Sequence, residues 1–199
     1  MALIDFPIFN AAPRLSSGRV TLRLGCADDY DAWRRLRDNS REHLIRWEPD
    51  WTDEEASLTS YRALVRGYAR AARRGVAAPY FVFRRNTADL IGGVNLINIS
   101  RGAAQSATLG YWLGAKFTGH GYASEAVGAV LEHGFETLRL HRIEAACQPG
   151  NSASARLLEG LGFRREGLAE RYLRINGRWR DHIIYAKTAC EHSENPHRR

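Results

Sequence analysis

An Asn-Gly pair at positions 176–177 separates two long runs of strand-like residues, Arg164–Ile175 and Arg178–Thr188. Asn-Gly between two such runs is the strongest short-range signal for a β-hairpin, because both residues readily adopt positive φ. The chain is therefore expected to end in two antiparallel strands. A doubly wound sheet alternates strand and helix to its end, so this C-terminus disfavours that fold.

The remaining elements follow from hydrophobic periodicity and from residues that begin helices. Strands are predicted at 19–24, 80–85, 90–98, 107–113 and 143–147, and helices at 28–39, 52–74, 123–137 and 152–161. Asp28 is the expected cap of the first helix, and Thr52 with Glu55 forms the capping box expected to open the second. Residues 1–16 are expected to be irregular. These elements predict an α/β (α+β) fold with a mixed, mostly antiparallel seven-stranded sheet.

Length and composition fit one domain over residues 1–199, with a core at about 18–189 and a flexible polar tail at 190–199. The longest uncharged stretch has 14 residues, 102–115, which is shorter than the roughly 18 that a membrane span needs. The N-terminus lacks the positive region of a signal peptide. We therefore expect a cytoplasmic protein without membrane association. The three cysteines (Cys26, Cys147, Cys190) are far apart and there is no HExxH, so neither a disulfide framework nor a metal site is predicted.

The net charge is +7, and all but two of the 29 basic residues are arginine. Such a balance fits proximity to a polyanion, either an RNA-rich particle or a phosphate-bearing cofactor. A general bias toward arginine with scattered surface charge explains it equally well. Charge alone therefore leaves the class of partner open.

The segment from Thr118 to Ser124, with the sequence TGHGYAS, lies between a predicted strand and a predicted helix. Its two glycines permit a tight turn, and the free N–H groups at the helix start can then face an anion such as a pyrophosphate. A plain glycine-rich turn is an alternative interpretation. A Rossmann loop is another, but it requires a parallel βαβ unit, whereas only about 75 residues follow and they close in a hairpin.

A second segment, 151–163, reads NSASARLLEGLGF and has the form of a capped helix with a glycine after its last turn. The two segments, about 30 residues apart, are more specific together than either alone. With their flanks (GYWLGAKFTGHGYASEAV, HRIEAACQPGNSASARLLEGLGF and EGLAERYLRINGRWRDHIIYA) they resemble the GNAT acetyltransferases. Within that family the chain is similar to the RimJ/RimL type of ribosomal-protein-alanine N-acetyltransferase, RimJ in particular. RWEP at 46–49 and NISRG at 98–102 extend the resemblance over about residues 18–189.

The resemblance implies a GNAT fold in which the two central strands, here about 107–113 and 143–147, splay apart. The pantetheine arm of acetyl-CoA would lie in the gap beside Leu113, and Asn151 matches the family asparagine that contacts pantetheine. The residues that match the pyrophosphate-binding loop are Gly119, His120, Gly121, Tyr122, Ala123 and Ser124. Arg156 is either a ligand of a cofactor phosphate or a solvated helix arginine. Thr118 departs from the glutamine or arginine of the superfamily motif, which removes one side-chain contribution and leaves the backbone amides in place.

The implied reaction is acetyl-CoA-dependent acetylation of an N-terminal alanine α-amine, the acceptor being a ribosomal protein, with no metal. An α-amine has a pKa of about 7.7–8.0 and lysine about 10.4, so deprotonating lysine costs roughly 3.4 kcal/mol more. An N-terminal acceptor therefore needs only a weak or water-relayed base. Two alternatives remain: acetylation of a small amine such as a polyamine, amino acid or aminoglycoside, and a ribosome-associated assembly factor with residual CoA binding.

The family tyrosine that protonates the leaving thiolate is missing, because Leu157 and Leu158 stand at its place. Ser154 matches the serine used instead in RimL-type enzymes and is the predicted acid. The glutamate base of RimL aligns with Leu173, so that role cannot be carried over.

The base is sought in the acidic segment 48–55 (EPDWTDEE), which is anomalous in a basic chain. Asp53, Glu54 and Glu55 are explained as first-turn carboxylates of a helix, whereas Glu48 and Asp50 precede the cap and are not. Glu48, within the RimJ-like WEP, is the predicted base, with Glu144 and water as its rivals. Trp47 and Trp51 flank the same place and either wall the acceptor groove or pack in the core.

Overall fold

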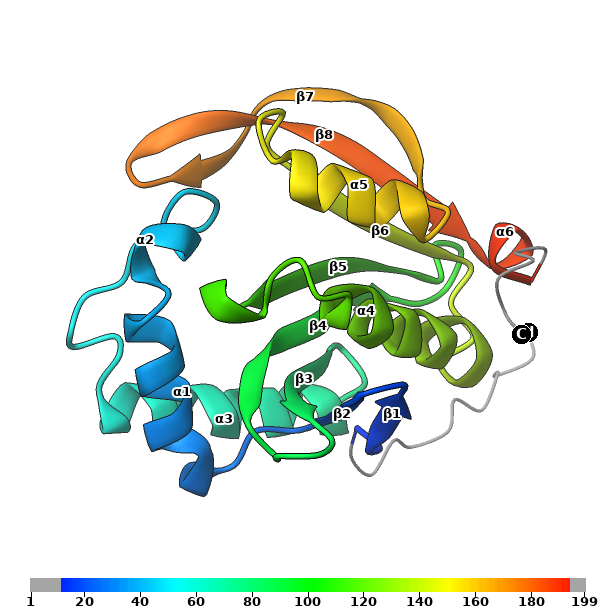
Figure 1. Cartoon of the computed structure of the whole chain (residues 1–199). Coiled ribbons are helices and arrows are strands. Elements are labelled where there is room, and N and C mark those ends of the chain that lie inside the picture. The colour runs from blue at the N-terminus through cyan, green and yellow to red at the C-terminus, as the bar shows by residue number, and fades with distance from the viewer. Residues whose placement is uncertain (1–11, 194–199) are drawn as a thin grey trace.

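The computed structural model describes residues 12–193 as one eight-stranded sheet with helices on both faces (Figure 1). The strands are β1 (Leu15–Ser17), β2 (Val20–Arg23), β3 (Ala78–Arg84), β4 (Leu90–Ser100), β5 (Ser106–Leu113), β6 (Arg142–Cys147), β7 (Arg164–Ile175) and β8 (Arg178–Thr188). The helices are α1 (Tyr30–Asp38), α2 (Arg41–Leu44), α3 (Leu58–Arg73), α4 (Tyr122–Glu132), α5 (Ser152–Gly160) and α6 (Ala189–Ser193). Spatial order is β1-β2-β3-β4-β5-β6-β8-β7, and of these pairs only β5–β6 is parallel.

All seven predicted strands are present, and the predicted hairpin turns at Asn176 and Gly177 with φ of 48° and 77°. The eighth strand, β1, was predicted to be irregular. It is three residues long and turns into β2 at Gly18, whose φ of +50° suits glycine. Such a short edge strand leaves too few alternating residues to be recognised in a sequence.

Residues 190–193, predicted to belong to a flexible tail, are helical instead, because α6 covers Ala189–Ser193. The Glu191 carboxylate accepts hydrogen bonds from the Thr188 backbone N–H at 2.8 Å and from its hydroxyl at 2.7 Å, which fixes the first turn. The rest of the tail, 194–199, and residues 1–11 lie outside the described residues.

Two helix starts differ from the predictions. Asp29, rather than Asp28, accepts from the backbone N–H of Cys26 at 2.9 Å at the entry to α1. Thr52 and Glu55 do form the reciprocal hydrogen bonds of a capping box, at 2.7 and 3.2 Å, but they close a separate turn. The second long helix, α3, begins at Leu58, where the Ser57 hydroxyl accepts from the Ser60 N–H at 3.3 Å.

The helices cover opposite faces of the sheet. Consecutive strand residues point to opposite sides, and on β3 the Tyr80 ring lies 6.0 Å from His133 whereas Phe81 lies 6.3 Å from Tyr61 of α3. His133 belongs to a π-helical turn that continues α4. One face is therefore covered by α3, with α1 packed on it, and the other by α4. In Figure 1, α4 and α5 lie in front of the strands.

No helix among residues 12–193 is long and apolar enough to cross a membrane.

Candidate active site

The parallel strands β5 and β6 stay together over only four residue pairs. The pairing runs from Ser106 opposite Arg142 to Leu109 opposite Ala145, and beyond it the strands diverge, as Figure 1 shows. The last residues of β5, 110–113, pair with β4 on one edge, and no strand within residues 12–193 pairs with them on the other. Their backbone groups on the open edge can pair with an extended ligand, as an added strand would. Leu113, the residue predicted to lie beside pantetheine, ends this open edge.

The glycine-rich loop leads directly from this edge into α4. Gly119 and Gly121 have φ of +77° and +83°, which L side chains rarely adopt, and Gly121 is the residue that caps α4. The first intrahelical bond joins the Glu125 N–H to the Gly121 carbonyl at 3.2 Å. The N–H groups of residues 121–124 therefore have no partner within the helix and sit at the positive end of its dipole. Unpartnered N–H groups at a helix start are suited to an anion such as a pyrophosphate, and binding of a pyrophosphate here stays a prediction.

Arg19 braces the loop from the neighbouring β1–β2 turn, a role that the sequence did not reveal. Its guanidinium donates to the His120 carbonyl at 2.8 Å and to Glu125 in the first turn of α4 at 2.7 Å. It also lies 4.7 Å from the centre of the Tyr122 ring. Because these contacts join positions about a hundred residues apart, no local pattern could have indicated them.

Ser154 lies in the first turn of α5, beside the diverging strands. Asn151 caps this helix, its side-chain oxygen accepting from the Ser154 N–H at 3.1 Å, so its amide NH₂ is the group left to donate to a ligand. The Ser154 hydroxyl is 2.5 Å from the phenol oxygen of Tyr111 on the open part of β5. Burial raises the pKa of the Cys147 thiol at the end of β6, and a hydrogen bond with Ser154 opposes that rise. Residues of β5, β6 and α5 thus come together at the Ser154 hydroxyl.

Glu48 is held by an ion pair with Arg37 of α1, with an N–O distance of 2.7 Å. The guanidinium lies 3.9 Å from the Trp51 ring centre and 5.1 Å from that of Trp112 on β5. Both members of the pair are largely covered, with side chains 27% (Glu48) and 13% (Arg37) exposed. Burial raises the pKa of Glu48, and the Arg37 charge opposes the rise. Trp51 is thus a packing residue against Arg37, and Trp47 lies near the β6–α5 turn at Gly150.

The predicted acid and base stand on opposite faces of the sheet. Tyr111 and Trp112 are consecutive on β5, so their side chains point to opposite sides. Tyr111 reaches Ser154 on the α4–α5 face, whereas Trp112 reaches Arg37 and its partner Glu48 on the α1–α3 face. Only where β5 and β6 have separated is there no strand between the two faces.

The acidic segment is largely neutralised by nearby arginines. Besides the Arg37–Glu48 pair, Asp50 pairs with Arg41 and Asp53 with Arg34, each at 2.8 Å. Three of the five carboxylates in the segment are therefore balanced by arginines from other parts of the chain.

The other predicted residues lie farther from the divergence. Glu144 is opposite Thr108, inside the paired part of the two strands, and binds Arg142 at 2.7 Å. Arg156 is exposed on α5 and forms no ion pair within residues 12–193. The two leucines at the place of the family tyrosine pack inward, with Leu158 fully buried.

The tip of the C-terminal hairpin closes the Glu48 side of the site. The Asn176 side chain donates to the Ile45 carbonyl at 3.0 Å and accepts from the Asp50 N–H at 2.6 Å. The hairpin thereby fixes both ends of the loop that carries Glu48. The Asn-Gly sequence predicted the turn and gave no sign of this contact.

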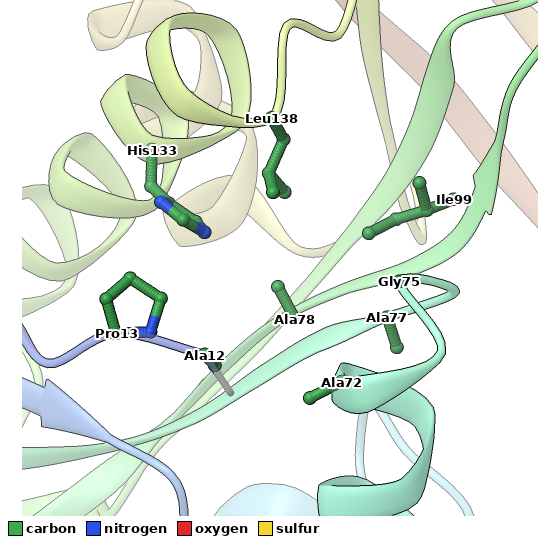
Figure 2. Close-up of a pocket in the computed structure, with 9 residues that line it drawn as sticks. All are labelled: Ala12, Pro13, Ala72, Gly75, Ala77, Ala78, Ile99, His133 and Leu138. Carbon is green, nitrogen blue, oxygen red and sulfur yellow. The ribbon is translucent and has the colours of Figure 1, made fainter. Parts of the chain in front are cut away.

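A small apolar cavity lies elsewhere, between the end of α3, the residues before β1 and the π-helical turn (Figure 2). His133 points toward Pro13 there, and burial lowers the pKa of this histidine to about 4. A neutral, covered imidazole in an apolar lining is a packing feature. Across residues 12–193 no group of His, Cys, Asp or Glu is arranged to hold a metal ion.

Comparison with known proteins agrees with this geometry. Residues 19–164 match the family model described as an acetyltransferase (GNAT) domain. The [ribosomal protein uS5]-alanine N-acetyltransferase of Escherichia coli is 35% identical over 178 residues, covering 88% of this chain and 90% of that one. The structure of Mycobacterium smegmatis RimJ in complex with CoA-disulfide superposes with a TM-score of 0.84 and 36% identity, over 92% of this chain and 89% of that one. Vibrio fischeri ribosomal-protein-S5-alanine acetyltransferase gives 0.83 and 30%, over 89% and 97%.

The fold and the comparisons thus define an acyltransferase with diverging central strands. The chain belongs to the GNAT acetyltransferase family, in its RimJ-like branch.

The loop geometry predicts how CoA binding responds to substitution. Gly121→Val places a branched side chain at a φ of +83°, where a Cβ would also lie 3.1 Å from the Arg19 guanidinium. The strain of about 1–2 kcal/mol and the displaced amides should weaken CoA binding at least tenfold in a calorimetric titration. His120→Ala should change the affinity less than twofold, since this residue contributes only backbone. Equal affinity of wild type and Gly121→Val, with unchanged melting temperature, would contradict the assignment.

Proposed function

We propose that this protein is a cytoplasmic N-acetyltransferase that transfers the acetyl group of acetyl-CoA to the α-amine of an N-terminal alanine, the acceptor being a ribosomal protein. The carrying observation is the divergence of β5 and β6, with Ser154 on one face of the opening and Glu48 on the other. The similarity to the uS5-alanine N-acetyltransferase over nearly the whole of both chains supports the choice of acceptor.

In this proposal the donor binds on one face of the sheet and the acceptor on the other. On the α4–α5 face, residues 119–124 and the open edge of β5 hold the nucleotide and pantetheine parts of the donor, and Ser154 meets the sulfur as the C–S bond breaks. On the other face, the hairpin tip and the loop before α3 border the acceptor, and Glu48 takes the proton that the amine loses. A base of modest strength is sufficient, because an α-amine is partly neutral near pH 7.

A peptide panel tests the acceptor. Peptides of one sequence that begin with alanine, with serine or with N-acetylalanine, each with one internal lysine, are incubated with acetyl-CoA and mapped by mass spectrometry. We expect acetylation at the free alanine α-amine and none at lysine, whose deprotonation costs more. Turnover of spermidine or free amino acids with no peptide acetylation would instead establish a small-amine acetyltransferase. CoA binding without turnover of any amine would favour an assembly factor.

Glu48→Gln keeps the size of the side chain and removes its charge and basicity. We expect kcat/KM for the alanine peptide to fall about 100-fold at pH 7, and to recover in part at pH 9, where most of the α-amine is neutral. The groups that face Glu48 are Arg37 and Tyr68. Burial raises the pKa of Glu48, and the base must be ionised to accept a proton. In the wild-type pH profile of kcat/KM, the acid limb should therefore give an apparent pKa above that of an ordinary glutamate.

Asp53→Asn is the matched control for this variant. Asp53 pairs with Arg34 in the same segment but is 88% exposed, so its substitution should leave kcat/KM within twofold. Full activity of Glu48→Gln with an inactive Glu144→Gln would move the base to β6. If neither matters, water takes the proton.

We also propose that the enzyme binds its acceptor protein close to ribosomal RNA. The net charge of +7 supports this, as do exposed arginines on the C-terminal hairpin, among them Arg171, Arg174, Arg178 and Arg180. A ribosomal RNA fragment should bind with an affinity that falls steeply as salt rises. Binding that is equally strong after Arg174→Ser and Arg178→Ser would show that the hairpin is not involved.

A further inference from the structure

The hydroxyl of Ser154 has a partner that sequence and family resemblance did not assign. The phenol oxygen of Tyr111 lies 2.5 Å from the Ser154 Oγ and 3.4 Å from the Ser154 carbonyl oxygen. Tyr111 is two residues beyond the last pair of β5 with β6, so its ring stands at the mouth of the divergence. The tyrosine thus contacts both the hydroxyl and the backbone carbonyl of Ser154.

Ser154 alone is a poor proton donor for a thiolate. A thiol has a pKa of about 8.5 and a phenol about 10, whereas an alkyl hydroxyl is far less acidic than either. A serine that gave up its proton unaided would be left as an alkoxide in a partly buried site. A phenol hydrogen-bonded to the same oxygen can replace the proton as it leaves, which lowers that cost because a phenol is more acidic than an alkyl hydroxyl.

Building on the proposed function, we infer that Tyr111 is the positioning and proton-supplying residue behind Ser154, and that the two form a relay to the leaving sulfur. As the amine nitrogen bonds to the acetyl carbon, the C–S bond breaks and its electron pair goes to sulfur. Sulfur takes the proton of Ser154 Oγ, Ser154 Oγ takes that of Tyr111, and Tyr111 regains one from solvent. The proton that the amine loses goes to Glu48 or water.

The surroundings of Tyr111 keep its phenol protonated in the resting enzyme. The groups that face it are Ser154 of α5, Cys147 of β6 and Tyr185 of β8, whose hydroxyl donates to Glu159 at 3.0 Å. Burial raises the pKa of Tyr111 to about 12, while the hydrogen bond with Ser154 opposes the rise. No cation is among these neighbours, so the phenol is neutral at physiological pH.

The test compares kcat for CoA thiol release in Tyr111→Phe, Ser154→Ala and the double variant. Each single variant should lower kcat about 100-fold, within the range of general acid–base catalysis, with little change in KM for acetyl-CoA. The double variant should be no slower than either single one, because both act in one relay. Tyr61→Phe is the matched control: it removes another buried, hydrogen-bonded phenol, on the opposite face of the sheet, and should leave kcat within twofold.

A second variant separates proton supply from packing. Difluorotyrosine at position 111 keeps the ring and its hydrogen bond but lowers the phenol pKa, so the alkaline fall in kcat should shift to lower pH. Unchanged kcat in Tyr111→Phe would overturn the relay. So would an unshifted pH limb in the fluorinated protein or an additive double variant.

These outcomes are distinguishable from failure of the proposed acceptor. Thiol release is followed with whichever of the alanine peptide, alaninamide or water the wild type uses fastest, so the relay is measured even if no peptide is acetylated.

Discussion

The structure depends on how short the parallel pairing between β5 and β6 is: it covers four residue pairs and then ends. Every other strand pair in residues 12–193 is antiparallel and most continue for longer. Beyond this point β6 stays paired with β8, and β5 stays paired with β4. The sheet therefore opens in its middle while each half remains hydrogen-bonded. The opening exposes a strand edge within a covered sheet, and an extended ligand can complete it.

Residues that hold this opening come from both faces and from distant parts of the chain. Arg19 ties the loop before α4 to the β1–β2 turn, and Asn176 ties the hairpin tip to the loop that carries Glu48. Arg37, whose guanidinium lies over the Trp51 ring, compensates the partly buried carboxylate of Glu48. A partly buried ion pair is retained at some cost in desolvation. Its place beside the opening is consistent with a role in chemistry more than in stability.

The sequence predicted those features that depend on a few adjacent residues. The Asn-Gly turn, the glycine loop and the Asn151 cap each depend on the conformational preference of a few adjacent residues, and all three are present. Thr52 and Glu55 illustrate the limit, because their hydrogen bonds form but α3 begins six residues after Thr52, where Ser57 offers a second cap. The contacts of Tyr111, Arg19 and Asn176 join residues more than forty positions apart and leave no periodic signal. The ion pairs of the acidic segment leave no local signal for the same reason, since the arginines that pair with Glu48, Asp50 and Asp53 belong to other elements.

Backbone amide hydrogen exchange, with and without CoA, tests the central claim that the separated strands are the donor site. Residues 106–109 are already paired on both edges and should exchange slowly in both states. The account predicts new protection on CoA binding at residues 110–113, where the edge of β5 toward β6 has no partner strand, and at residues 119–124, in the loop and at the start of α4. Protection confined to the hairpin 164–188 or to the region of His133, or CoA binding with no change at the open edge of β5, would contradict it.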